Sequence, residues 1–202
     1  MRSSWILAAS LFAAVPESSS RAPELVERAI LVAFDSRTGH TERLARAVAD
    51  GAASVEGARV VVKPESEVRE EEILGASGIL LGSPVHWASQ SAKAKLFLER
   101  IGDALVRAKE LGPESTPRNR TAGAFVTGGA PSSGKELARL AILAAFLNMR
   151  FIVVGGEESD GFGTLGAQAT TAGGDPGVSE EELEEARRFG RRFATVTLAL
   201  VQ

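Results

Sequence analysis

From residue 28 onward, short apolar runs alternate with stretches of helical periodicity. Apolar runs without polar alternation are typical of strands that are covered on both faces. Strands that alternate with helices form parallel sheets with helices on both sides. We therefore predict an α/β fold with a five-stranded, doubly wound parallel sheet in three α/β/α layers. The predicted strands are 29–34, 58–62, 78–83, 123–127 and 150–155, and the predicted helices are 41–52, 67–76 (or a turn), 90–108 and 135–149.

A last helix is predicted from the capping box of Ser179 and Glu182 to the C-terminus. The chain has 202 residues, 44% of them hydrophobic, which suffices for one well-filled domain. We expect this domain over residues 27–202, preceded by an extension over residues 1–26. Between the last predicted strand and the last helix, residues 155–178 are rich in glycine and predict a long irregular loop.

The N-terminal extension resembles a secretory signal peptide, because one arginine precedes the apolar run Trp5–Val15. This run is too short to span a bilayer, so we expect no stable membrane span. We expect a cytoplasmic protein. The alternative is an exported protein, if residues 1–20 act as a signal peptide.

Charge and composition exclude several classes of function. The net charge of −3 leaves no basic surplus for binding nucleic acid. The absence of cysteine excludes thiolate catalysis, disulfides and cysteine-based metal centres. Only His40 and His86 supply imidazoles, so no metal site is predicted.

The loop after the first predicted strand leads straight into a helix and carries an unusual number of hydroxyl groups. Helix N-termini attract anions through unpaired amides and the helix dipole, and a glycine lets the backbone approach closely. The simpler alternative is that Thr38 or Thr41 only caps the helix. We favour an anion site, which consists of Ser36, Arg37, Thr38, Gly39, His40 and Thr41.

The loop after the third strand reads "GSPVHWASQ". Pro84 is expected to end the strand and to leave His86 and Trp87 at the loop tip. An exposed indole at this place can stack on a planar ring, although a tryptophan that only caps the core is the alternative. Neither histidine has a serine or aspartate partner for nucleophilic catalysis.

The loop after the fourth strand, "TGGAPSSGKEL", contains a match to the P-loop pattern over residues 129–135. Glu136 stands where a P-loop has the hydroxyl that holds Mg²⁺, so a nucleotide hydrolase is a poor alternative. The loop also suits the polar edge of a flat heterocycle. A second match, G-x-G-x-x-G over residues 161–166, is discarded because it is not flanked by a strand and a helix.

These loops, together with the C-terminal stretch "TTAGGDPGVSEEELEEARRFGRRFA", resemble a known family. The chain is similar to the FMN-dependent NAD(P)H:quinone oxidoreductases of the tryptophan-repressor-binding-protein family. The resemblance implies a flavodoxin-like fold with strand order 2-1-3-4-5 and FMN at the switch point. It also implies NADH or NADPH as reductant, a quinone as substrate, and a homo-oligomer, either a dimer or a tetramer.

The resemblance assigns roles to the loop residues. Residues 36–41 would wrap the FMN phosphate. The isoalloxazine would lie against Pro84, Val85, His86 and Trp87. Its pyrimidine edge and the ribityl chain would lie against Thr127, Gly128, Gly129, Ala130, Pro131 and Ser132. No catalytic side chain is assigned, because the cofactor carries the chemistry and the protein supplies position and electrostatics.

Three positions depart from the family pattern. The residues Leu147–Met149 stand where the family has a histidine, Leu165 stands in place of a tyrosine, and Ala88 stands in place of a glycine. Two further functions stay open. One is a flavodoxin-type electron carrier without a substrate of its own, and the other is a binding module without flavin.

Overall fold

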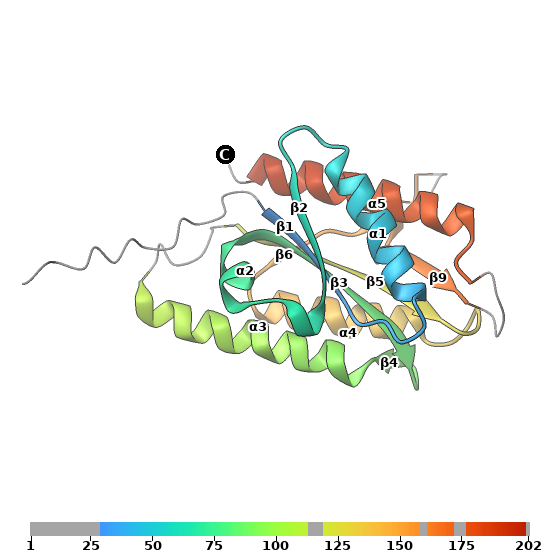
Figure 1. Cartoon of the computed structure of the whole chain (residues 1–202), viewed down its shortest axis with the longest axis horizontal. Helices are drawn as coiled ribbons and strands as arrows, with labels where there is room; N and C mark the ends of the chain where they lie inside the picture. The colour runs from blue at the N-terminus through green and yellow to red at the C-terminus, as the bar shows by residue number, and fades with distance from the viewer. Residues whose placement is uncertain (1–28, 113–118, 158–160, 172–176, 201–202) are drawn as a thin grey trace, which may run out of the picture.

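A computed structural model describes residues 29–112, 119–157, 161–171 and 177–200 (Figure 1). The predicted extension over residues 1–26, with its signal-peptide resemblance, lies outside the described residues. Within the described part of the chain, no helix is both long enough and apolar enough to cross a membrane.

The centre of the molecule is a parallel sheet of order β2-β1-β3-β5-β6, which confirms the predicted doubly wound topology. β9 extends the sheet beside the carboxyl end of β5, and β4 pairs antiparallel with the end of β3. The strands are β1 (Ala29–Phe34), β2 (Arg59–Pro64), β3 (Ala76–His86), β4 (Ser89–Gln90), β5 (Thr121–Gly128), β6 (Ile152–Val153) and β9 (Gln168–Thr170).

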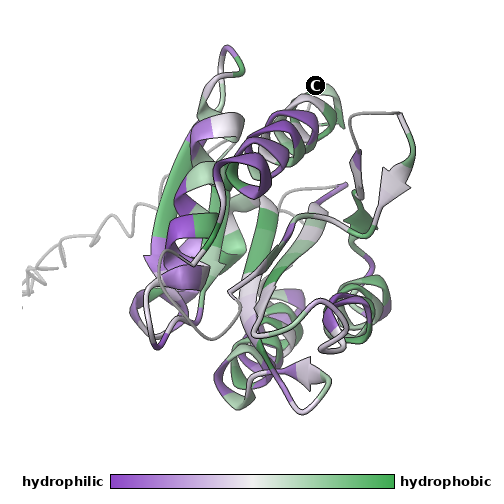
Figure 2. Ribbon diagram, turned by 90° about the vertical axis from the view of Figure 1, so that its right-hand side faces the viewer, coloured by the Kyte–Doolittle hydropathy of each residue, from purple (hydrophilic) through white to green (hydrophobic). Residues whose placement is uncertain are grey.

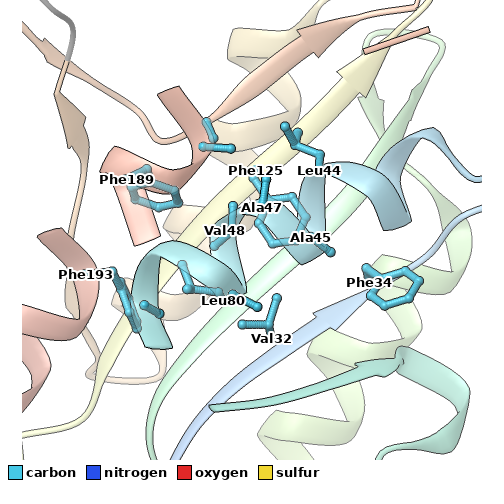
Figure 3. Close-up of a cluster of buried hydrophobic side chains, with 14 of the residues drawn as sticks. Val32, Phe34, Leu44, Ala45, Ala47, Val48, Leu80, Phe125, Phe189 and Phe193 are labelled. Atoms are coloured by element: carbon cyan, nitrogen blue, oxygen red, sulfur yellow. The ribbon is translucent and has the colours of Figure 1, made fainter. Parts of the chain in front are cut away.

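Helices cover both faces of the sheet, as the buried apolar strands require (Figures 1 and 2). α1 (His40–Ala53) and α5 (Glu180–Leu200) pack on one face. Figure 3 shows part of this cluster, in which Phe125 lies among side chains of α1 and α5. The other face is covered by the 3-10 helix η1 (Glu65–Glu67), α2 (Glu70–Gly75), α3 (Ala92–Leu111) and α4 (Lys135–Asn148).

The start of α5 confirms the predicted capping box. The Glu182 amide donates to the hydroxyl of Ser179 over 3.3 Å, and the Ser179 amide donates to the Glu182 carboxylate over 2.8 Å. Each group satisfies an otherwise unpaired amide at the helix start.

The predicted fifth strand is wrong in its extent. The two-residue strand β6 pairs with the start of β5, and a different strand, β9, pairs with the end of β5. Between them, β7 (Gly156–Glu157) and β8 (Gly163–Thr164) form a small antiparallel hairpin within the stretch predicted to be irregular. The chain leaves the sheet at Gly155, where a Cβ would collide with the carbonyl oxygen of Thr164, so the packing of the hairpin there depends on glycine.

Pro84 does not end the third strand, contrary to the prediction. β3 continues to His86, and Pro84 stays in register with Thr127 of β5. β1 pairs with β3 only as far as Gly82, so β3 has no β1 partner at Pro84. A proline fits where a ladder partner is missing, because it has no amide hydrogen to donate.

α1 and α5 cross closely at two glycines. A Cβ on Gly190 would collide with the carbonyl oxygen of Val48, and a Cβ on Gly51 would collide with that of Arg187. The two helices can approach this closely because neither glycine carries a side chain. The contact fixes α5 against α1, whose N-terminus belongs to the candidate site.

We expect Gly190→Ala to lower the free energy of unfolding by about 2 kcal/mol, because the added methyl overpacks the helix crossing. The matched control is Gly102→Ala in α3, where the new Cβ meets only the Met149 methyl, at 3.5 Å. The control is expected to stabilise by up to about 1 kcal/mol through helix propensity. Urea unfolding curves of both variants measure the difference. Equal effects of both changes would contradict the close crossing.

Candidate functional site

Three loops meet at the carboxyl ends of β1, β3 and β5 (Figure 1). They are residues 35–39 before α1, the hairpin between β3 and β4, and residues 129–134 before α4. The parallel registers bring them together: Phe34 pairs with Gly82, and Pro84 pairs with Thr127. All residues predicted to bind the cofactor lie in these loops or at the strand and helix ends beside them.

The first loop leaves the N-terminus of α1 without a side-chain cap. Gly39 is the N-cap residue with φ of +87°, a left-handed conformation that suits glycine, and a Cβ there would meet no atom within 4 Å apart from its chain neighbours. The alternative that Thr38 or Thr41 caps the helix is therefore wrong. The buried hydroxyl of Ser36 has no hydrogen-bond partner among the described residues. Uncapped amides and an unpaired hydroxyl are what an anionic group at this helix end would use.

The other polar residues of this loop have different surroundings. Arg37 and Thr38 are exposed, and the Thr38 hydroxyl lies 3.0 Å from Nδ1 of His40. The His40 ring packs closely on Gly177, which precedes α5. Thr41 is buried, and its hydroxyl lies 2.8 Å from that of Thr127 at the end of β5. Thr41 thus joins the first and third loops beneath the site.

The hairpin between β3 and β4 presents Trp87 at its tip, fully exposed. Trp87 and Ala88 have φ of +54° and +63°, respectively, so two successive residues with side chains adopt the left-handed conformation. This conformation costs roughly 1–2 kcal/mol for each such residue. The surrounding packing must therefore impose the turn, which carries the indole away from the core.

Two contacts hold this hairpin. The hydroxyl of Ser83 donates to the carbonyl of Pro84 over 2.8 Å and accepts the amide of Ser91 over 2.9 Å. Gly134, at the start of α4, packs so closely on Ala88 that a Cβ there would collide with it. The hairpin is thereby tied to the starts of both α3 and α4.

In the third loop, Thr127 and Gly128 are buried at the end of β5, and the residues 129–132 are exposed. The adjoining Ser133 was not among the predicted site residues. Its hydroxyl is buried without a hydrogen-bond partner among the described residues, as that of Ser36 is. Its position in the run Ser132-Ser133-Gly134 is a signal that the sequence already contained.

Lys135 of the P-loop-like motif is directed into the protein. Its ammonium group donates to the Thr170 hydroxyl of β9, and the Thr170 amide donates to the Glu182 carboxylate over 2.6 Å. Burial lowers the pKa of Lys135. The cation fixes the third loop to β9 and is not presented to a ligand in this loop, so the structure gives no support to the nucleotide-hydrolase alternative.

Asp35 was also missed by sequence reasoning. It directly follows β1, its side chain is buried, and its carboxylate lies 3.7 Å from the Lys93 ammonium of α3. Its amide donates to the carbonyl of Gly82 over 3.0 Å, which extends the contact between β1 and β3. An acidic residue at the end of a buried strand was the available signal.

A separate cavity of about 380 Å³ lies between α4, α5 and the β7–β8 hairpin. None of the predicted site residues lines it. Its buried Arg139 donates to the carbonyl of Gly166 over 2.6 Å and to the side-chain oxygen of Gln168 over 2.9 Å. Burial lowers the pKa of Arg139. Among the described residues, no group of histidine, aspartate and glutamate side chains is placed to hold a metal ion.

Comparisons with known proteins agree with this fold. Residues 59–161 match the family model described as NADPH-dependent FMN reductase. A flavodoxin of Aquifex aeolicus is 35% identical over 166 residues, covering 82% of this chain and 84% of that protein. An NAD(P)H dehydrogenase (quinone) of Archaeoglobus fulgidus is 31% identical over 195 residues, covering 83% and 96%. The crystal structure of a flavodoxin, WrbA-like protein from Agrobacterium tumefaciens shares the fold, with a TM-score of 0.64, 22% identity and coverage of 86% and 99%.

We expect Ser36→Ala to raise the unfolding free energy of the apo-protein by up to about 1–3 kcal/mol, because the buried hydroxyl has no partner to lose and its desolvation is unfavourable. The same change is expected to weaken FMN binding about tenfold, the value of one hydrogen bond to a charged group. Urea unfolding and fluorescence titration measure the two effects. The control Ser83→Ala removes a doubly bonded hydroxyl and is expected to destabilise the apo-protein by about 1–3 kcal/mol. Apo-protein destabilised equally by both changes would contradict an unpaired Ser36.

Proposed function

The chain belongs to the flavodoxin-like family of FMN-dependent NAD(P)H:quinone oxidoreductases, and from this membership we propose that it reduces quinones by two electrons through bound FMN. It is a flavin-dependent oxidoreductase with FMN as cofactor and NADH or NADPH as reductant. The assignment of a quinone as substrate rests on relatives of moderate identity that are called NAD(P)H dehydrogenase (quinone).

The observation that carries the proposal is the uncapped N-terminus of α1 beside the unpaired hydroxyl of Ser36. A phosphate group placed there would accept hydrogen bonds from the first-turn amides and from Ser36, and the helix dipole would stabilise its charge. Thr38 and Arg37 are exposed and within the same loop, so they can close over the phosphate. Thr41 acts from beneath, through its contact with Thr127.

The flavin ring would lie between the other two loops. FMN held there would supply the two-electron redox chemistry between a nicotinamide and a quinone. The hairpin residues Pro84, Val85, His86 and Trp87 would border one side of the ring, with the exposed indole as a stacking surface. Residues 127–132 would border its polar edge, and the Ser133 hydroxyl is a further donor there.

The proposed mechanism assigns binding and orientation to the protein rather than proton transfer. His86 and His40 are the imidazoles of the chain, and His40 is engaged with Thr38 and Gly177. The ring position depends on the hairpin, which Ser83 and Gly134 hold in its left-handed turn. Because the hairpin tip is exposed, a nicotinamide and a quinone can reach the same face in turn.

A second candidate is an electron carrier without a substrate of its own. The 35% identity to the Aquifex aeolicus flavodoxin favours it. Carriers tend to be strongly acidic so that they dock on basic partners. The net charge of −3 is weak for that role. The matches to the NAD(P)H dehydrogenase relatives cover 95–98% of the length of those proteins, so we prefer the enzyme.

The test is the visible spectrum of the purified full chain during anaerobic reduction. We expect one FMN per chain, bleaching by NADH or NADPH, and recovery of the oxidised spectrum with one quinone consumed per flavin. Two nicotinamides compared at equal concentration identify the preferred reductant. If dithionite bleaches the flavin but neither NADH nor NADPH does, the protein is an electron carrier. Colourless protein that takes up no FMN would show a binding module.

We expect the double variant Thr38→Val, Gly39→Val to weaken FMN binding by at least 100-fold, because valine disfavours the left-handed conformation of Gly39 and covers the helix N-terminus. Lys135→Ala is the matched comparison and is expected to change the affinity by less than about tenfold, since its ammonium group bonds Thr170. Flavin fluorescence titration measures both. Equal losses would count against placing the phosphate at α1.

A further inference from the structure

The cavity of about 380 Å³, which contains none of the predicted site residues, lies where the edge of the sheet is interrupted. β6 pairs with β5 only up to Ala122, and β9 pairs with it only from Val126 onward. Between these two strands the chain leaves the sheet and forms the β7–β8 hairpin. Because α4 and α5 cover opposite faces of the sheet (Figure 1), the cavity opens between the two helices and the hairpin. A cavity of this size is large enough for a small molecule.

One wall of the cavity is formed by Arg139 of α4, whose side chain is 4% exposed. Its guanidinium donates to the carbonyl of Gly166 and to the side-chain oxygen of Gln168, which belong to the same wall. A guanidinium has five N–H bonds, and two of them are used in this way. The other three, including that of the buried Nε, have no hydrogen-bond acceptor among the described residues. A buried cation with unused donors requires an acceptor, which a ligand in the cavity can supply.

Carboxylates outnumber this guanidinium in the lining of the cavity. Glu136, Glu157 and Glu185 also line it. The last two each have an arginine of α5 as partner, at 3.2 and 3.9 Å, and neither of these arginines lines the cavity. Glu136 lies 3.7 Å from Arg139, which is beyond hydrogen-bond distance. The surplus of carboxylates disfavours a ligand that is only anionic, and a ligand that is only cationic would leave the Arg139 donors unused. The lining therefore suits a ligand that carries both charges.

The rest of the lining includes apolar side chains. Phe189 of α5 is 1% exposed, and Leu165 and Ala167 come from the segment between β8 and β9. An aliphatic group that packs on these side chains would be removed from water, which is favourable. A ligand with an apolar part beside its charged groups would use both kinds of wall.

We propose that this cavity is a binding site for a free α-amino acid with an apolar side chain of about the size of leucine. The carboxylate of the amino acid would accept hydrogen bonds from Arg139, and its ammonium group would donate to Glu136. Its side chain would pack on Phe189 and Leu165. The two charged groups of an α-amino acid are attached to one carbon atom, which matches a guanidinium and a carboxylate 3.7 Å apart. Arginine is the side chain best suited to bind a carboxylate, because its planar fork can donate two parallel hydrogen bonds.

The cavity is connected to the loop that borders the candidate cofactor site, and this step rests on the proposed function. Glu136 and Arg139 lie in the first two turns of α4, which follows residues 129–134 directly. Thr170 of β9 accepts a hydrogen bond from Lys135 at the start of the same helix. An amino acid held by α4 would therefore steady the third loop, and FMN would bind the steadied loop more tightly. By linkage, FMN would strengthen the binding of the amino acid by the same factor.

Isothermal titration calorimetry of the full chain with three matched probes tests the site. Leucine carries both charges, isocaproate lacks only the ammonium group, and isoamylamine lacks only the carboxylate. We expect leucine to bind with a dissociation constant of about 1 mM or below, and each analogue to bind about tenfold more weakly or worse, because it loses a charge-assisted contact. Absence of leucine binding, or equal binding of the three probes, would overturn the proposal. Inorganic phosphate that binds more tightly than leucine would show an anion site and would overturn it as well.

Two substitutions of glutamate by glutamine test the contact with the ammonium group. Glu136→Gln changes a side chain that is 59% exposed, so we expect the fold to be kept, leucine to bind about tenfold more weakly, and isocaproate to bind as before. The control Glu181→Gln changes another exposed glutamate, which does not line the cavity, and is expected to leave all three affinities unchanged. Leucine affinity that is equal in the two variants would overturn the assigned orientation of the ligand.

Titration of FMN with and without saturating leucine tests the connection to the third loop. We expect leucine to raise the affinity for FMN about fivefold, and Glu136→Gln to abolish this effect at the same leucine concentration. Leucine that binds without a change in FMN affinity would overturn the connection but not the amino-acid site. A chain that binds leucine and takes up no FMN would overturn the proposed function and the connection, while the amino-acid site would be supported.

Discussion

The pairing of β1 with β3 and of β3 with β5 is the constraint on which the rest of the structure depends. These buried parallel strands end side by side, so three loops that are far apart in the sequence meet at one edge. The Asp35 amide and the Thr41–Thr127 contact extend the pairing beyond the strands themselves. The close crossing of α1 and α5 then fixes the helix whose N-terminus faces this edge.

Two hydroxyl groups at this edge are left unsatisfied, while neighbouring side chains beneath them are engaged. The hydroxyls of Ser36 and Ser133 are buried without partners among the described residues, whereas Ser83, Thr41 and Lys135 are all engaged. A buried unpaired hydroxyl costs about 1–3 kcal/mol, so such groups mark places where a ligand can restore the bonds. The engaged side chains keep the loops in place for that ligand.

The sequence alone predicted the fold because apolar runs and helical periodicity depend on local composition. The positions of the three loops followed from the topology of a parallel sheet. The polar residues in these loops led to the hypothesis that they bind a phosphate group. Three features could not be predicted from the sequence: the extent of the fifth strand, the course of β3 through Pro84 and the inward direction of Thr41. Each depends on which part of the chain lies beside it in the fold, and tertiary packing decides that. Ser133 and Asp35 were missed because burial decides their chemistry, and a single sequence does not display burial.

The most direct measurement of the central claim compares FMN with riboflavin, which has the same ring but no phosphate. If the N-terminus of α1 and Ser36 bind the phosphate, riboflavin should bind at least about 100-fold more weakly, since charge-assisted hydrogen bonds contribute about 1.5–3 kcal/mol each. In the variant Thr38→Val, Gly39→Val this difference should largely vanish. Equal affinity of the natural protein for FMN and riboflavin would contradict the account.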